Sequence, residues 1–175
     1  MIDAELIKTV CTVLCKTLTP AQAKEILAAA NSVSFPAGRV VFQEGDEGSG
    51  LYLFHKGTVE IVKQGPDGST QRLATVEAPT VLGEMSVVTA SSHSATVRTL
   101  TDCEFRLLTR AEFQRLLAGE NLAAYKLLGA IAEVLSRRLL KMDEKVVELL
   151  GQRDNPRPVE ELVRFKQKLF SEWSF

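Results

Sequence analysis

The sequence predicts an α+β fold in which a small antiparallel β-barrel lies between N-terminal helices and one long C-terminal helix. Short β-rich runs separated by glycine and proline turns fill residues 32–109. This pattern is typical of a β-barrel or β-sandwich. Helical periodicity precedes this part at residues 1–31 and follows it at residues 110–150. A chain of 175 residues has room for one domain with appended helices but not for two full domains.

Two helices are predicted in the N-terminal residues 1–31. The first spans residues 3–18, because apolar side chains recur there every three or four residues: Ile7, Cys11, Leu14, Cys15 and Leu18. The second begins at Thr19, whose hydroxyl can cap a helix. Pro20 suits its first position and Gln22 completes a capping box. This helix ends at Asn31.

Six strands are predicted between residues 32 and 109: Arg39–Phe42, Leu51–His55, Thr58–Lys63, Gln71–Val76, Ala95–Leu100 and Glu104–Leu108. Glycine-containing turns separate most of them, because glycine readily adopts positive φ. One connection, Glu77–Ser94, is much longer and holds a helical candidate at Glu84–Val88. Long connections inside compact domains are usually functional, so a site is expected there.

Helical patterns return after residue 109. Thr109 and Glu112 form a second capping-box pattern, and Gly119 ends the helix that they begin. The helix predicted at residues 121–150 carries apolar residues that alternate spacings of three and four without a slip: Tyr125, Leu128, Ala132, Leu135, Leu139, Met142, Val146 and Leu149. This pattern is a coiled-coil seam. It predicts a parallel homodimer through residues 122–150.

Residues 151–175 form a predicted tail. Glycine and two prolines interrupt the long helix at residues 151–158, and a last amphipathic helix spans Pro158–Phe170. The apolar residues between 158 and 173 make a large patch for an unpartnered surface. The tail is therefore expected to fold back on its own barrel or to dock on a protein partner.

Composition excludes several classes of protein. The 21 basic and 22 acidic residues give a formal net charge of −1, so no basic excess indicates nucleic-acid binding. No apolar run approaches the ~20 residues of a membrane span, and the N-terminus does not resemble a signal peptide. Three cysteines argue against a disulfide framework and for a reducing compartment. We expect a cytoplasmic protein that binds neither nucleic acid nor membrane.

Metal binding and catalysis have weak support. Cys11 and Cys15 stand one helical turn apart, a spacing that can share a metal, but structural zinc takes four ligands. The other candidate ligands are scattered, namely Cys103, His55 and His93. Buried thiols are the better interpretation, and no metal is expected. No serine, histidine and carboxylate set stands at a recognisable catalytic motif, so we expect no catalytic residues and no enzyme activity.

Residues 41–57 resemble the signature of cyclic nucleotide-binding domains. An apolar strand leads to Gly45-Asp46, four apolar residues follow at 51–54, and Gly57 closes a hairpin. The helix–barrel–helix order is similar over residues 19–150. The resemblance implies a cyclic-nucleotide-binding-type β-roll, which is a jelly-roll-like barrel, flanked by helices. It also implies a regulatory function in signalling.

Residues 83–96 resemble the phosphate-binding cassette of the same family. The resemblance implies that backbone N–H groups at the start of a short helix face the cyclic phosphate and that Glu84 accepts a ribose hydroxyl. An arginine normally stands ten residues after the glycine. That position here is His93, followed in register by Ser94, Ala95 and Thr96. The implied ligand-binding residues are Gly83, Glu84, Met85, Ser86, His93, Ser94 and Thr96.

Histidine in place of this arginine predicts weakened phosphate pairing. Losing one partner of a charged hydrogen bond costs ~1.5–5 kcal/mol, which lowers affinity ~10- to 1,000-fold or more. A protonated His93 would substitute in part, because an adjacent anion favours the imidazolium. Arg98 lies an odd number of residues away, so it should point to the opposite face of its strand.

Two functions follow from these residues. The first is a dimeric regulatory domain that binds cAMP, cGMP or a related anionic nucleotide as ligand, without a cofactor, and relays occupancy to the long helix. The second is a degenerate domain that acts as a dimerisation or interaction scaffold. The retained Glu84 favours the first. Family members that are transcription factors append a winged helix-turn-helix, for which the 25 residues after Leu150 are too few, so DNA binding is not expected.

Overall fold

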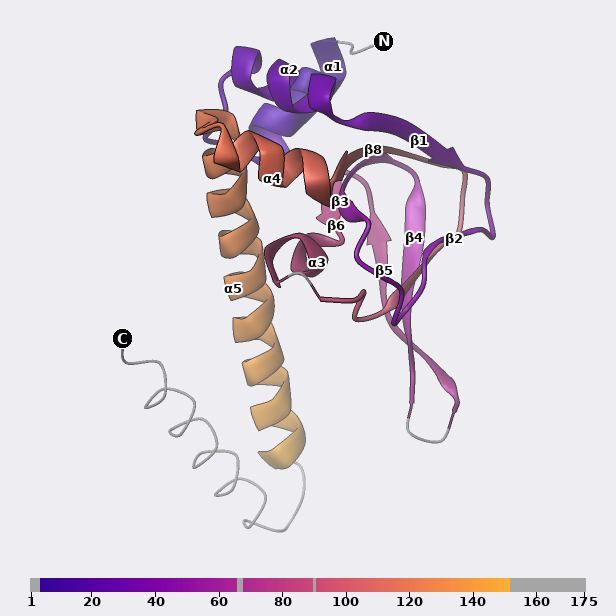
Figure 1. Ribbon diagram of the computed structural model, residues 1–175. Helices are drawn as coiled ribbons and strands as arrows, with labels where there is room; N and C mark the ends of the chain where they lie inside the picture. The colour runs from indigo at the N-terminus through magenta and orange to yellow at the C-terminus, as the bar shows by residue number, and fades with distance from the viewer. Residues whose placement is uncertain (1–3, 66–67, 90, 152–175) are drawn as a thin grey trace. The chain divides into compact units, whose positions relative to one another are not determined.

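The computed structural model describes residues 4–65, 68–89 and 91–151 (Figure 1). The chain divides into two compact units, Met1–Ile131 and Ala132–Phe175. The first unit contains the N-terminal helices, all the strands described and the beginning of the last helix. The predicted tail helix at 158–170 falls outside the described residues.

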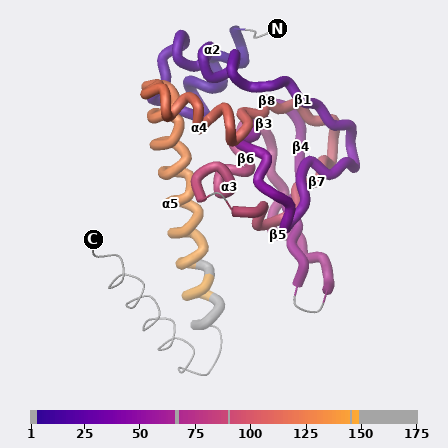
Figure 2. The backbone as a smooth tube through the Cα atoms, in the orientation of Figure 1, coloured from indigo at the N-terminus to yellow at the C-terminus, as the bar shows by residue number. Residues whose placement is uncertain are grey.

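The described part of the first unit contains eight strands in two antiparallel four-stranded sheets. Their order is β1-β8-β3-β6 in one sheet and β2-β7-β4-β5 in the other. Figure 2 traces the path of the chain through them. The strands are β1 (Asn31–Phe35), β2 (Val40–Phe42), β3 (Gly50–Lys56), β4 (Thr58–Gln64), β5 (Thr70–Glu77), β6 (Thr80–Leu82), β7 (Thr96–Thr99) and β8 (Cys103–Thr109). The predicted α+β fold is therefore confirmed, and the barrel is a β-roll.

The six predicted strands are all present, with ends that differ by at most one residue, whereas β1 and β6 were not predicted. Both lie at the edge of their sheet. The helical candidate inside the long connection is α3 (Glu84–Thr89). The β3–β4 hairpin turns at Gly57, where φ is 107° and a Cβ would lie 2.6 Å from the carbonyl oxygen of Asp102. Only glycine fits that turn.

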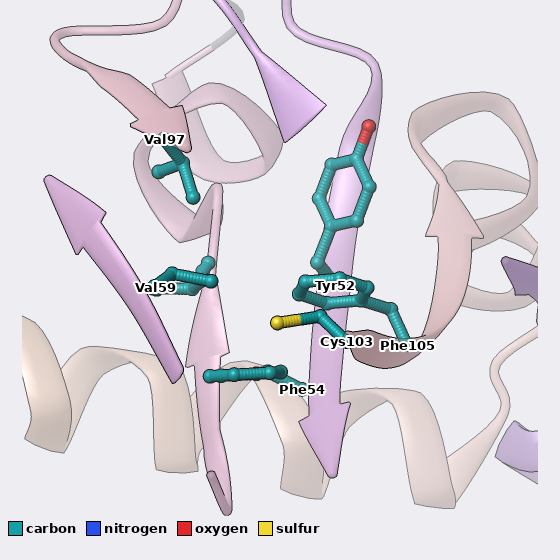
Figure 3. Close-up of a cluster of buried hydrophobic side chains, with 7 residues drawn as sticks. Tyr52, Phe54, Val59, Val97, Cys103 and Phe105 are labelled. Carbon is teal, nitrogen blue, oxygen red and sulfur yellow. The ribbon is translucent and has the colours of Figure 1, made fainter. Parts of the chain in front are cut away.

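The hydrophobic core lies between the two sheets. Its central side chains point toward one another in Figure 3. They are Tyr52, Phe54, Val59, Leu82, Val97, Cys103 and Phe105. The rings of Phe54 and Phe105 stack with centroids 4.7 Å apart, and β3 contributes most because Gly50–Phe54 is buried throughout. A strand buried on both faces reads as a continuous apolar run, which is why β3 was evident from the sequence.

The first predicted helix is wrong in part. It is α1 (Ala4–Thr9) followed by a π-helical turn, η1 (Val10–Leu14), which is closed by a 2.8 Å bond from the Cys15 N–H to the Val10 carbonyl oxygen. The wider π turn rotates the buried face. The buried side chains of residues 4–18 are Leu6, Val10, Leu14, Cys15 and Leu18, while Ile7 and Cys11 are only half-buried.

The capping patterns decide where the next two helices begin. α2 (Pro20–Ala29) has both bonds of the predicted box between Thr19 and Gln22. α4 (Arg110–Ala118) begins with the Thr109 hydroxyl accepting from the Glu112 N–H at 3.2 Å. Within the described residues only this half of the second box forms, since the Glu112 carboxylate accepts from Arg115 instead. Gly119 ends α4 as predicted.

The last helix, α5 (Leu122–Gly151), passes from the first unit into the second. In the first unit it buries Ala123, Ala124, Leu127 and Ile131. The predicted seam uses other positions: Tyr125, Leu139 and Met142 are 48%, 52% and 63% exposed, and Leu128, Leu135 and Val146 are half-buried. Across the residues that the structure describes, no helix is long and apolar enough to cross a membrane.

Candidate functional site

The cassette begins where β6 meets α3. Gly83 joins them with φ at 75°, and a Cβ on it would lie 2.6 Å from the carbonyl oxygen of Gly50. A side chain at this position would therefore meet both strained backbone and a fixed carbonyl. Glu84 follows as the first residue of α3 and is 4% exposed. The predicted ribose-binding carboxylate is thus buried beside β3.

The loop between β2 and β3, residues 43–49, holds both arms of the cassette. The His93 N–H donates to the carbonyl oxygen of Asp46, and the His93 carbonyl accepts from the Gly45 N–H, each at 2.9 Å. A Cβ on Gly48 would lie 2.2 Å from the Cβ of Ser86. The loop and cassette are therefore packed so closely that Gly48 has no room for a side chain. The signature motif positions the cassette.

The return arm of the cassette is bonded to β4 and to the same loop. The Thr96 hydroxyl accepts from the Glu44 N–H at 2.9 Å. The Lys63 ammonium donates to the Ser94 carbonyl oxygen at 2.9 Å and lies 3.6 Å from the Glu44 carboxylate. This places one exposed cation at the cassette, although it already has two oxygen neighbours.

The remaining predicted residues differ in exposure. Ser86 is 2% exposed, and its hydroxyl donates to the Gly83 carbonyl oxygen at 2.8 Å, which closes the first turn of α3. Met85 is 43% exposed and its sulfur accepts a long 3.5 Å bond from the exposed Ser94 hydroxyl. The structure therefore brings all seven predicted residues into one connected segment, with Glu84 and Ser86 turned inward.

His93 is packed as a core residue. Its side chain is 4% exposed, and its ring stacks on Phe42 with centroids 3.9 Å apart and planes 14° apart. Its Nε2 lies 3.2 Å from the Ser49 hydroxyl and 3.4 Å from the Ser49 N–H, and that hydroxyl lies 2.9 Å from the Tyr52 hydroxyl. The Ser49 N–H donates to Nε2, so Nε2 carries a lone pair.

Burial sets the charge of this histidine. Desolvation lowers the pKa of His93 below its ordinary value, and the Asp46 carboxylate opposes that shift only in part. The ligand-free chain therefore holds a neutral imidazole at pH 7. The cassette position that normally carries a guanidinium charge therefore carries none here until the ring is protonated.

Arg98 does not replace the missing arginine. Its Nε donates to the Glu60 carboxylate at 2.6 Å, and the Arg72 Nε forms an ion pair with the other carboxylate oxygen at 2.8 Å. Glu60 is 2% exposed, and these guanidinium groups lower the pKa of Glu60. Both arginines are therefore held by a buried carboxylate on β4. The strand β7 begins at Thr96, so the alternation along a strand that was used to place Arg98 opposite His93 does not extend to His93.

Sequence reasoning did not identify two residues that contact His93, namely Phe42 and Ser49. Both lie inside the signature motif at 41–57, so that motif was the available signal. Nothing in the sequence, however, indicates which way the His93 ring turns. The structure adds that the motif and the cassette form one packed and hydrogen-bonded site.

The comparisons with known proteins agree with this geometry. The family model "Cyclic nucleotide-binding domain" matches residues 32–120. A cGMP-dependent protein kinase of Drosophila melanogaster is 30% identical over 107 residues, which are 61% of this chain and 9% of the kinase. The CRP-like cAMP-activated global transcriptional regulator of Mycobacterium tuberculosis is 26% identical over 136 residues, covering 78% of this chain and 59% of the regulator.

A solved structure shows the same architecture. The catabolite activator protein of Thermus thermophilus superimposes with a TM-score of 0.66 at 29% identity, covering 77% of this chain and 61% of that protein. This chain spans less than two thirds of each of these relatives. The family match nonetheless covers more than half of it and includes the signature and the cassette. The chain therefore belongs to the cyclic nucleotide-binding domain family, as a regulatory domain of that family.

Proposed function

We propose that this chain is a non-catalytic sensor that binds cAMP or cGMP in its cassette and relays occupancy through α4 to α5. The observation that carries the proposal is the buried Glu84 at the start of a cassette that keeps the family's register around His93. A carboxylate is costly to bury and serves a ribose hydroxyl directly. The relatives named for cAMP and cGMP support the ligand class. The unpaired thiols Cys11, Cys15 and Cys103 support a cytoplasmic location.

Direct titration of the chain with cAMP and cGMP tests this function. Because His93 is neutral, we expect dissociation constants ~10- to 1,000-fold weaker than an arginine-containing cassette would give. Cyclic dinucleotides are titrated as well, to test the alternative of a related anionic ligand. The linear nucleotide 5′-AMP is the control, since it lacks the cyclic phosphate. Isothermal calorimetry should show saturable 1:1 binding per chain. No heat and no thermal shift with any cyclic nucleotide at millimolar concentration would contradict the proposal.

We also propose that α5 forms a parallel homodimer through residues 122–150. Support comes from the seam, whose side chains at Leu139 and Met142 are more than half exposed. In this register Arg138 and Asp143 occupy g and e positions, which pair across parallel helices. The tail at 158–173 remains a second predicted surface, for a protein partner.

Leu135→Asp should split the dimer, because it places a charge in the apolar seam. Leu140→Asp is the matched control, since Leu140 is 61% exposed and lies off the seam. Sedimentation at tens of micromolar should give a dimer for the wild type and the control, on the order of affinities that such helices reach, and a monomer for Leu135→Asp. A monomeric wild type would refute the homodimer.

The second candidate function, a scaffold that no longer binds nucleotide, has one observation in its favour. His93 is neutral, stacked on Phe42 and bonded to Ser49 like an ordinary core side chain. In a scaffold these contacts would serve only to hold the loop and the cassette together. The titration above and the Glu84 variants below distinguish this function from ligand binding.

A further inference from the structure

Among the residues that the structure describes, the arginine that begins α4 has no charged partner. Arg110 is the first residue of α4 and is half-buried. Its Nε is buried and makes no hydrogen bond, and no carboxylate among the described residues pairs with its guanidinium. By contrast, Arg72 and Arg98 share Glu60, and Arg115 pairs with Glu112. Buried donors are almost always bonded in folded proteins, so a missing partner calls for an explanation.

The backbone of Arg110 lies against Ser49 and Gly50, two residues that themselves contact the cassette. Its N–H donates to the carbonyl oxygen of Ser49 at 3.3 Å, and Ser49 is the residue that bonds His93 Nε2. A Cβ on Gly50 would lie 3.1 Å from the Arg110 nitrogen, and the Gly50 carbonyl oxygen lies against Gly83. α3 packs on α4 (Figure 1). Arg110 is thus one residue contact away from Gly83 and from His93.

The charge of Arg110 is unfavourable where it stands. α4 has nine residues, and a cation at the N-terminus of a helix faces the positive end of its dipole. His93, which is joined to Arg110 through Ser49, is neutral because burial lowers its pKa, so it supplies no charge of its own. An anion bound at the cassette would form an ion pair with the Arg110 guanidinium. The same anion would also offset the positive end of the α4 dipole.

We propose that Arg110 supplies the guanidinium that pairs with the anionic group of the ligand, in place of the arginine absent at position 93. The assignment rests on the proposed function. Guanidinium is suited to the task, because its planar fork can donate two parallel bonds to a phosphate. Lys63 is the other nearby cation, but its ammonium is already held by Ser94 and Glu44. Arg110 is the one whose buried donor lacks a partner.

The test compares Arg110→Gln and Arg110→Lys with the matched control Arg115→Gln. Arg115 lies on the same helix, is exposed and has its own ion pair with Glu112. The probes are cAMP and cGMP, with adenosine and guanosine as uncharged analogues that keep the base and ribose. We expect Arg110→Gln to weaken cyclic-nucleotide binding at least ~10-fold. Arg110→Lys should weaken it less, and Arg115→Gln should leave it unchanged.

Two further readouts separate ion pairing from support of the fold. Arg110→Gln should bind the uncharged nucleosides as the wild type does, and its unliganded melting temperature should equal or exceed that of the wild type. If the wild type binds cyclic nucleotide and Arg110→Gln binds it equally well, this assignment is wrong and the proposed function stands. Equal losses for nucleosides and cyclic nucleotides, with a lower melting temperature, would make Arg110 structural and also overturn it. A wild type that binds no cyclic nucleotide contradicts the proposed function and this assignment together.

Discussion

Replacing Glu84 with alanine should abolish cyclic-nucleotide binding while leaving the unliganded chain at least as stable as the wild type. Glu84 is 4% exposed, and a buried carboxylate is costly to desolvate. If its purpose is to accept a ribose hydroxyl, removing it relieves that cost and removes the ligand contact. Binding residues commonly show this trade between function and stability. We expect affinity to fall by two orders of magnitude or more, on the scale of losing a charged hydrogen bond.

In a scaffold the same substitution should have the opposite effect on stability. Glu84 would then be retained to support α3, and its removal should cost ~1 kcal/mol, as the loss of a helix cap does. Thermal unfolding of Glu84→Ala and Glu84→Gln, with and without cyclic nucleotide, separates the two functions. Glu104→Ala is the control, because Glu104 is exposed and paired with Lys56. A lower melting temperature for Glu84→Ala, together with a wild type that no nucleotide stabilises, would leave the scaffold standing.

The elements that the sequence predicted well are those set by local chemistry. Thr19 and Gln22 cap α2 by bonds within one turn, and Gly57 takes a conformation that other residues avoid. β1 was missed because its run Asn-Ser-Val-Ser-Phe is largely polar. Its extended form comes from pairing with β8, from Asn31 opposite Leu107 to Phe35 opposite Cys103. β6 has only three residues and pairs with β3. Long-range pairing defines both strands, and a local pattern does not record it.

The candidate site divides in the same way. Counting from Gly83 placed His93 in register, because backbone spacing is a local property. The direction of its ring depends on Phe42 and Ser49, which are brought to it by the fold from more than forty residues earlier. The unpartnered guanidinium of Arg110 is also a result of packing. The sequence could therefore locate the cassette but could not assign charge within it.

The stability of the ligand-free chain should fall as the pH drops from ~7 to ~5.5, and His93 should be the cause. Burial holds the pKa of folded His93 below its unfolded value, which is about 6.5. As the pH falls, the unfolded chain therefore binds a proton at this histidine before the folded chain does. The contribution of neutral His93 to the free energy of unfolding is complete above the unfolded pKa and is lost below it. Cationic partners lower the pKa values of three carboxyl groups, those of Glu60, Glu104 and Glu112. Protonation of these groups destabilises the folded chain only at more acidic pH.

The chain has two histidines, so His55→Gln is a matched control. Urea or thermal unfolding between pH 5.5 and 8 should give a sloping stability for the wild type and for His55→Gln. His93→Gln should flatten the slope. If the wild type and His93→Gln show the same pH dependence over this range, the neutral imidazole is not the source of the slope.

Cyclic-nucleotide affinity should change in the opposite direction, rising as the pH falls from ~8 to ~5.5. The imidazolium is the form that can pair with a phosphate, and a bound anion favours it. His93→Arg should tighten binding at least tenfold, because guanidinium is permanently charged and can donate two parallel bonds. The same variant should unfold more easily without ligand, since it brings a charge to a position that is 4% exposed against Phe42. Affinity that is flat across this pH range, together with an arginine variant that binds no better, would show that the position of His93 does not contact the phosphate.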